Sequence, residues 1–170
     1  MQSPIMCNGF HIRPLRQADR EGVAALFARL SPDSLFQRFH SAGVRVVDAV
    51  LDQVTAGHVL IAEADGSLVG LASYHRGRHR SDAELAIVVD DANQRRGVGT
   101  ALCKCLSRDA QDAGIQQLRA DLLPTNQAML GVLRALNLPM HHVSMRDVVQ
   151  VTLDLRPQWL TCAGRETVSA

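Results

Sequence analysis

The sequence has few aromatic residues and no long apolar run, and both absences exclude classes of protein. It contains one Trp, one Tyr and four Phe, so Tyr74 is the single candidate for any mechanism that uses a tyrosine. No apolar stretch approaches the roughly 18 residues that span a bilayer. Residues 1–10 lack the basic region and apolar core of a signal peptide. We therefore expect no membrane partner and a cytoplasmic protein.

The four cysteines lack the spacing of a disulfide framework or a metal site. Cys7 and Cys162 lie near the two ends. Cys103 and Cys105 are two residues apart in one helical run, where they point to different sides. Because no Cys-x-x-Cys pair is present, we predict no metal and a reducing compartment.

An excess of charge of one sign is also missing. Eighteen basic and seventeen acidic residues leave a net charge of +1, which gives no reason to expect a nucleic-acid partner. One local basic cluster spans residues 75–81, where His75 and His79 alternate with arginines. No carboxylate or cysteine accompanies them at metal-ligand spacing. We interpret this cluster as a solvated hairpin that steers an acidic partner or a phosphate.

What the sequence does have is the alternating periodicity of one α/β domain. Its 170 residues are 46% hydrophobic, which suits a single core. Helical spacing of apolar residues predicts helices over 20–30, 32–39, 46–54, 98–113 and 124–137. Period-two or apolar runs predict strands over 11–16, 58–64, 67–74, 83–89, 117–122, 141–146 and 148–155. The strand 83–89 is apolar enough to be buried on both faces. This order indicates a mixed α/β layer fold with a domain over 11–155, an extension over 1–10 and a tail over 156–170.

The segment Gln94-Arg95-Arg96-Gly97-Val98-Gly99-Thr100 carries the chemistry. It follows an apolar strand and opens a helix, so its glycines permit a tight turn and its free N–H groups face an anion. The segment therefore predicts a phosphate or pyrophosphate cradle made of backbone. A P-loop needs a Gly-Lys-Ser/Thr run that is absent, and a dinucleotide fingerprint needs a glycine where Leu102 stands. An ordinary strand-to-helix turn is the alternative.

This segment resembles the acetyl-CoA signature of the GNAT (GCN5-related) N-acetyltransferase superfamily, Gln/Arg-x-x-Gly-x-Gly/Ala between a strand and a helix. The matching residues are Gln94, Gly97 and Gly99, and the order of elements over 11–155 also matches. The resemblance implies a mostly antiparallel sheet with a splayed parallel strand pair and flanking helices. It also implies acetyl-CoA as cosubstrate, no metal, and a primary amine as acceptor.

Within the superfamily, residues 30–39 (LSPDSLFQRF), 83–99 and 123–136 resemble the acetyltransferase domain of bacterial protein-lysine acetyltransferases. That resemblance implies Glu84 as general base and a pantetheine arm in the gap between strands 83–89 and 117–122. We expect these two strands to diverge near Val88 and Val89. The residues it implies for cofactor binding are Val88, Val89, Gln94, Arg95, Arg96, Gly97, Val98, Gly99, Thr100 and Asn126. Capping of its own helix is an equal alternative for Asn126.

The chemistry of amine acetylation asks for these groups. A lysine-type amine has a pKa near about 10.4 and must lose a proton before it attacks a thioester. The developing oxyanion needs a fixed donor, which the backbone N–H of Val89 can supply. For Glu84 the alternative is a solvated or salt-bridged side chain, and His141 is the next candidate base. The family's tyrosine that protonates the leaving thiolate has no counterpart in residues 136–142. The CoA thiolate is then released directly, or a serine or a histidine protonates it instead.

Three functions stay open at the level of sequence. The first is an amine N-acetyltransferase with a protein lysine as acceptor, and the second is the same reaction on a small amine. The third is a non-catalytic acyl-CoA-binding sensor. Acceptor loops vary while a cofactor site persists, so the sequence does not identify the acceptor. It does not decide between a monomer and a homodimer either.

Overall fold

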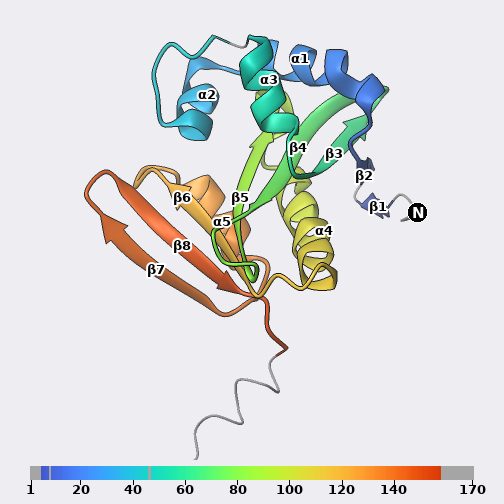
Figure 1. Cartoon of the computed structure of the whole chain (residues 1–170). Helices are drawn as coiled ribbons and strands as arrows, with labels where there is room; N and C mark the ends of the chain where they lie inside the picture. The colour runs from blue at the N-terminus through green and yellow to red at the C-terminus, as the bar shows by residue number, and fades with distance from the viewer. Residues whose placement is uncertain (1–4, 8, 46, 158–170) are drawn as a thin grey trace, which may run out of the picture.

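The protein folds around one eight-stranded sheet, as the computed structural model shows for residues 5–7, 9–45 and 47–157 (Figure 1). Val46, Cys162 and the tail over 158–170 lie outside the described residues, and side chains are described from Gly9 onward. The strands are β1 (Ile5–Cys7), β2 (Phe10–Pro14), β3 (His58–Ala64), β4 (Ser67–Arg76), β5 (Asp82–Val89), β6 (Gln117–Leu122), β7 (Met140–Met145) and β8 (Val148–Asp154). The helices are α1 (Arg20–Ala28), α2 (Pro32–Phe39), α3 (Asp48–Thr55), α4 (Val98–Asp112) and α5 (Gln127–Arg134).

The sheet has the order β1-β2-β3-β4-β5-β6-β8-β7, and its only parallel neighbours among the described strands are β5 and β6. Helix α4 makes the crossover between these two strands. The predicted mixed α/β fold with one parallel strand pair is confirmed. Strand β1 was not predicted: Met6 pairs with His11, so part of the extension over 1–10 joins the sheet.

Helices cover both faces of the sheet and divide the core into two apolar clusters (Figure 1). Helices α1 and α3 cover one face, with Leu26, Phe27 and Val54 fully buried. Helices α4 and α5 cover the other, where Leu102 and Leu133 are fully buried. Burial of each such side chain stabilises the fold by roughly 1.5–3 kcal/mol. No helix in the described part of the chain is long and apolar enough to cross a membrane.

The prediction that strand 83–89 is buried on both faces is only partly right. Ala83, Leu85 and Val88 are buried, but Glu84 is exposed, and Ile87 is only partly buried. Strand β5 loses its hydrogen-bonded neighbour β6 after Glu84, which accounts for the partial exposure of Ile87. The second half of this apolar strand therefore borders a gap.

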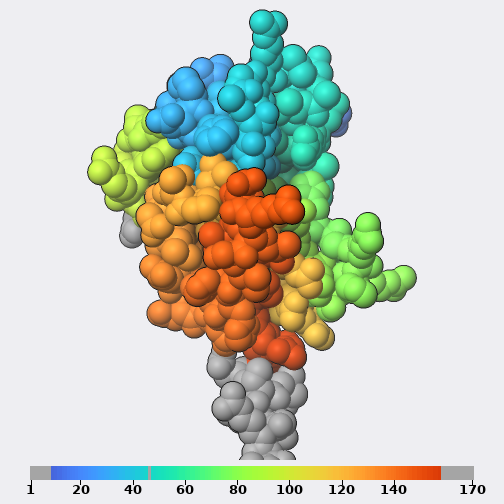
Figure 2. All heavy atoms as spheres, turned by 90° about the vertical axis from the view of Figure 1, so that its left-hand side faces the viewer, coloured from blue at the N-terminus to red at the C-terminus, as the bar shows by residue number. Residues whose placement is uncertain are grey.

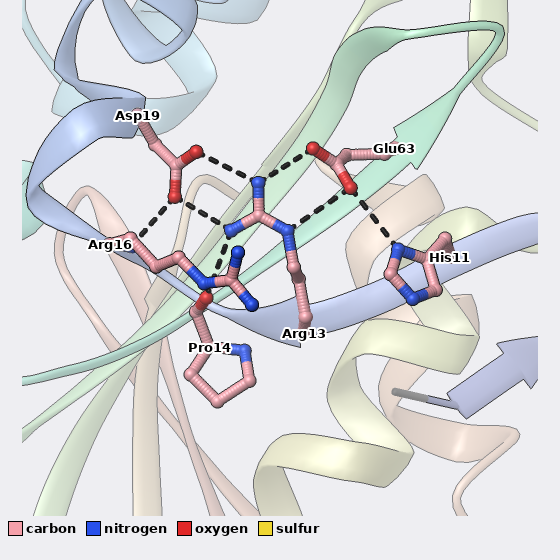
Figure 3. Close-up of polar contacts among 6 residues, drawn as sticks. All are labelled: His11, Arg13, Pro14, Arg16, Asp19 and Glu63. Carbon is pink, nitrogen blue, oxygen red and sulfur yellow. Dashed lines mark hydrogen bonds and ion pairs between the residues drawn. The ribbon is translucent and has the colours of Figure 1, made fainter. Parts of the chain in front are cut away.

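A polar network joins β2, β3 and the entry to α1 (Figure 3). Arg13 donates to both oxygens of Asp19 at 2.7 and 2.8 Å and to both oxygens of Glu63 at 2.7 and 3.1 Å. Asp19 also accepts from the backbone N–H of Arg16 at 2.7 Å, and Glu63 contacts His11 at 3.2 Å. The hydrogen bonds from Arg13 hold the pKa of each carboxyl below its ordinary value. The network therefore fixes the start of α1 against the sheet.

Candidate active site

The glycine turn lies between β5 and α4, where the sequence placed it. Gly97 precedes the helix with φ of 86°, in the left-handed region that favours glycine. The first bond of the helical ladder runs from the N–H of Ala101 to the carbonyl of Gly97 at 3.0 Å. The N–H groups of Val98, Gly99 and Thr100 precede that bond, so they point out of the helix start, where the dipole is positive. The turn has the geometry of an anion cradle.

Strands β5 and β6 separate from one another beside this turn. They pair in parallel only where Asp82–Glu84 lies beside Gln117–Arg119, although β5 continues to Val89 and β6 to Leu122. The parallel pairing is as predicted. The separation was expected near Val88 and Val89 but begins after Glu84, so the gap is longer than the sequence suggested.

The register of β4 and β5 decides which backbone groups face the gap. The N–H of Asp90 donates to the carbonyl of Val69 at 2.9 Å, and antiparallel pairs alternate in their bonding. Val88 therefore turns its backbone groups toward β4, whereas Ile87 and Val89 turn theirs toward the gap. The carbonyl of Val89 accepts from the side chain of Gln94 at 3.2 Å. The N–H of Val89 is thus not used by β4 and can donate to a ligand, and the backbone of Ile87, which was not among the predicted cofactor residues, faces the same way. The contact predicted for Val88 stays a prediction.

Apolar side chains from β5 and α5 lie around Gly99, beside the gap and the cradle. A Cβ atom on Gly99 would lie 3.4 Å from Cγ2 of Val132 on α5 and 3.7 Å from the side chains of Ile87 and Val89 on β5. All three of these side chains are only partly buried. A thin arm with amide groups, such as pantetheine, suits walls that are apolar with a few backbone donors. Sequence reasoning missed Ile87 and Val132 because their proximity depends on strand register.

Helix α2 is tied to the cradle end of the gap. Asp91 accepts from the N–H and hydroxyl of Ser31 at 2.9 and 2.8 Å and from the hydroxyl of Ser34 at 2.8 Å. Gln94 donates to Ser34 at 3.1 Å. Burial opposes ionisation of Asp91, but these hydrogen bonds outweigh burial and leave its pKa below the ordinary value. Gln94 therefore positions α2 and the Val89 carbonyl together.

The same helix reaches the other side of the gap. The side chain of Gln37 donates to the hydroxyl of Thr125, beyond the end of β6, at 3.4 Å. Helix α2 therefore spans the gap from the β5 end to the β6 end. In Figure 2 this blue helix lies above the orange and red strands of the C-terminal half of the sheet. The sequence motif at 30–39 was noticed for its resemblance, but its bridging role was not predicted.

Glu84 lies on the face of the sheet that α2 covers. Its side chain is exposed, and it makes no hydrogen bond or ion pair within the described part of the chain. The charged neighbour with which it interacts is Arg38 of α2, whose pKa is lowered by burial and raised by Glu84. The salt-bridged alternative for Glu84 is not observed, and its carboxylate is open to a substrate.

The remaining predicted cofactor residues differ in what they contact. Asn126 caps α5 by accepting from the N–H of Met129 at 3.0 Å, which leaves its amide NH₂ able to donate. Arg96 donates to Asn93 at 2.7 Å and lies 5.5 Å from the ring centroid of Phe10. Arg95 is exposed, with φ of 57°. The helix-cap role of Asn126 is observed, while its contact with a cofactor stays a prediction.

Two alternative catalytic groups are placed away from Glu84. Tyr74 pairs with Leu85 and stacks on His58 with ring centroids 5.0 Å apart, on the α4 face of the sheet opposite Glu84. His141 is on β7, separated from β5 by β6 and β8, which is about 14 Å at normal strand spacing. Neither position suits direct proton transfer at Glu84.

The buried cysteine of α4 and the basic hairpin do not add to the candidate site. Cys103 is buried, which raises the pKa of its thiol to about 12 and argues against a nucleophile. Within the described residues, no group of three or more His, Cys, Asp or Glu side chains could hold a metal. The basic hairpin over 75–81 and the cradle lie at opposite ends of β5 and project on different sides in Figure 2. The hairpin therefore does not contact a phosphate held at the cradle.

Comparison with known proteins points to one family. The profile of the acetyltransferase (GNAT) family matches residues 24–137. Acetyltransferase PA5475 from Pseudomonas aeruginosa is 30% identical over 127 residues, which cover 69% of this chain and 68% of that protein. Two further curated relatives are longer, and the chain spans only 38% and 35% of their lengths.

Solved structures share the fold. The GNAT domain of PAT from S. lividans superposes with a TM-score of 0.80 at 23% identity, covering 89% of this chain and 96% of that one. The structure of yncA from Salmonella typhimurium with its cofactor acetyl-CoA gives a TM-score of 0.67 at 22% identity, covering 88% of this chain and 96% of that one. At these identities the likeness establishes the fold alone.

Proposed function

Because this chain belongs to the GNAT acetyltransferase family and is an acetyl-CoA-dependent N-acetyltransferase, we propose that it acetylates a primary amine with Glu84 as general base. The observation that carries the proposal is the combination of an open cradle, a gap and a free carboxylate around one strand. The cradle follows β5, the gap runs along its second half, and Glu84 lies where pairing with β6 ends. A cofactor and an acceptor can therefore meet at one place on β5.

We assign acetyl-CoA to the cradle and the gap. Its pyrophosphate would be held by the N–H groups over 95–100, and Arg95 and Arg96 add positive charge beside that turn. Its pantetheine arm would run between β5 and β6 against Ile87, Val89 and Val132. The free amide NH₂ of Asn126 supplies a further donor. Acetyl-CoA contributes an acetyl group activated as a thioester.

The chain's own residues then have two tasks in the transfer. Glu84 accepts a proton from the ammonium of the acceptor, directly or through water, so that the amine can attack. The backbone N–H groups of Ile87 and Val89 face the gap, and one of them donates to the oxygen on which negative charge develops. Ile87 is the nearer of the two to Glu84 along the strand. Tyr74 lies on the other face of the sheet, so the leaving thiolate departs directly or takes its proton from another group. We also propose that the acetyltransferase domain spans residues 11–155 and that the protein is located in the cytoplasm.

A protein lysine is the first acceptor class to test, because the stretches over 30–39 and 83–99 resemble protein-lysine acetyltransferases. Small amines are the second class. The assay incubates the full chain with acetyl-CoA and a panel of lysine peptides and small amines, and detects acetylated product by mass spectrometry. We expect product with at least one amine. Binding of acetyl-CoA without any product would instead support a sensor, and no binding would refute both.

A further inference from the structure

Arg38 on α2 is a cation without a hydrogen-bond or ion-pair partner in the described part of the chain, near the proposed active site. Within the described residues none of its five N–H groups donates a hydrogen bond, and no carboxylate lies within ion-pair distance. Its Nε atom is buried without an acceptor. The terminal N–H groups are not buried in this way and can reach solvent or a ligand. A buried guanidinium N–H without an acceptor is costly to the fold. The unpaired guanidinium of Arg38 is therefore available to bind an anionic ligand.

The surroundings of Arg38 indicate where that partner would bind. Its Cζ atom lies 5.0 Å from the ring centroid of Phe39, so the aromatic ring covers part of the guanidinium while its N–H groups stay unpaired. The adjacent Gln37 has a buried Oε1 atom that also lacks a partner, while its amide nitrogen is held by Thr125. Glu84 is the charged group that acts on Arg38 from β5. Arg38 is thus the unsatisfied group whose charge interacts with that of the candidate base, and Gln37 is its neighbour on α2.

The hydrogen bonds of α2 hold Arg38 in this place. Ser31 and Ser34 bind Asp91 at one end of the helix, and Gln37 binds Thr125 near the other. A side chain on a helix fixed at two points is pre-organised to bind. Arginine donates two parallel hydrogen bonds to a carboxylate, which makes that group the natural ligand.

We propose that Arg38 binds an anionic group of the acceptor, a carboxylate close to the amine that is acetylated. This inference rests on the proposed function and adds the chemical class of the acceptor to it. The carboxylate has two potential sources: the main-chain carboxylate of a free amino acid, or an acidic side chain next to a lysine in a polypeptide. Lysine residues in neutral or basic surroundings are then poor acceptors.

Matched acceptors that differ only in this charge test the proposal. One arm compares lysine with lysinamide and alanine with alaninamide. The other compares end-blocked peptides containing Glu-Lys with the same peptides containing Gln-Lys. In at least one arm we expect kcat/KM to be about 10- to 100-fold higher for the acceptor that carries the carboxylate than for its neutral counterpart. This is the factor that a charge-assisted hydrogen bond typically contributes. Arg38→Gln abolishes this preference and leaves the KM for acetyl-CoA unchanged.

Arg119→Gln is the matched control. Arg119 pairs with Glu84 in the sheet register, but it already donates to Asp82 at 2.7 Å, so its removal should keep the preference. Arg38→Lys, which keeps the charge and loses the planar fork, should retain part of it. Lysine also should shift the Nε–H resonance of Arg38 in NMR spectra, whereas lysinamide should not.

Several results would overturn the inference while the proposed function stands. One is a wild type that acetylates amines with no preference for the carboxylate in either arm. Another is an Arg38→Gln variant that loses activity equally with both members of each pair, which would mean that Arg38 acts on Glu84. If no amine is acetylated at all, the proposed function fails, and the NMR comparison still decides whether Arg38 binds a carboxylate.

Discussion

Arg13 and Arg38 are both partly or largely buried, yet their surroundings are opposite. The side chain of Arg13 is 11% exposed and donates to Asp19, to Glu63 and to the carbonyl of Pro14 (Figure 3). Arg38 donates to nothing in the described part of the chain and has a buried Nε atom without an acceptor. The contrast separates two uses of the same residue type. A satisfied cluster holds the fold, and an unsatisfied one awaits a ligand.

The same contrast extends to the carboxylates. Asp19 and Glu63 are engaged by Arg13, whereas Glu84 is exposed and accepts no hydrogen bond within the described chain. Changes in the Arg13 network should therefore alter stability and spare turnover. Changes at Glu84 should do the reverse, and a result that mixes the two would break the comparison.

The largest effect is expected at the free carboxylate. Glu84→Gln should lower kcat about 100- to 10,000-fold, the usual contribution of a general base, with nearly unchanged acetyl-CoA affinity and unfolding temperature. Asp121→Asn is the control, because Asp121 lies on the next strand and binds Gln150. Full turnover by Glu84→Gln at neutral pH would refute the assignment.

The next largest effect is expected on acetyl-CoA affinity, where two glycines at the ends of α4 can be compared. Gly97 and Gly114 have φ values of 86° and 78°, so alanine strains the backbone at either by about 1–2 kcal/mol. Only Gly97→Ala should also displace the cradle, and we expect at least about a 10-fold loss of acetyl-CoA affinity, since 1.4 kcal/mol corresponds to that factor. Calorimetry checks this. Equal affinities for the two variants would show that the cofactor does not bind at this turn.

A third prediction concerns the partnered arginine. Arg13→Met should lower the free energy of unfolding by about 2–3 kcal/mol, less than for a fully buried pair because Glu63 is 28% exposed. Urea unfolding measures the change, and the KM for acetyl-CoA should not move. Arg20→Met is the control: its ion pairs with Asp48 and Asp52 are exposed, so stability should hardly change. A loss of turnover in folded Arg13→Met would contradict the separation of roles.

The smallest effect is a dependence of stability on acid. The pKa values of Asp19 and Glu63 are lowered by Arg13, so their contribution is complete above their ordinary pKa values, near about 4. It is lost as pH falls through the lowered values, at up to about 1.4 kcal/mol per pH unit for each carboxylate. Urea unfolding from pH 6 to pH 2 should show this decline, and Asp19→Asn should flatten it. An unchanged slope would mean that Asp19 titrates normally in the folded protein.

Local patterns in the sequence predicted much of the fold. A short apolar run placed β3 over His58–Ala64, and the glycine spacing placed the cradle between β5 and α4. These features depend on residues that are neighbours in the chain. Strand β1 was not predicted because its three residues are too few to show the alternation of a strand.

Features that depend on register or tertiary packing could not be predicted in this way. The orientation of the Ile87 backbone toward the gap follows from how β5 aligns with β4. The isolation of Arg38 follows from where α2 lies on the sheet. An arginine in an amphipathic helix is normally solvated, so the sequence alone gives no reason to single it out.

The most direct test of the account is calorimetric titration of acetyl-CoA into the wild-type chain. The cradle and gap predict saturable one-to-one binding, with a Kd between about 1 μM and 1 mM, the range in which enzymes usually hold their substrates. The acetyl-CoA concentration should be carried above 1 mM. Absence of saturable binding by the folded protein would contradict the cofactor site and, with it, the proposed acetyl transfer.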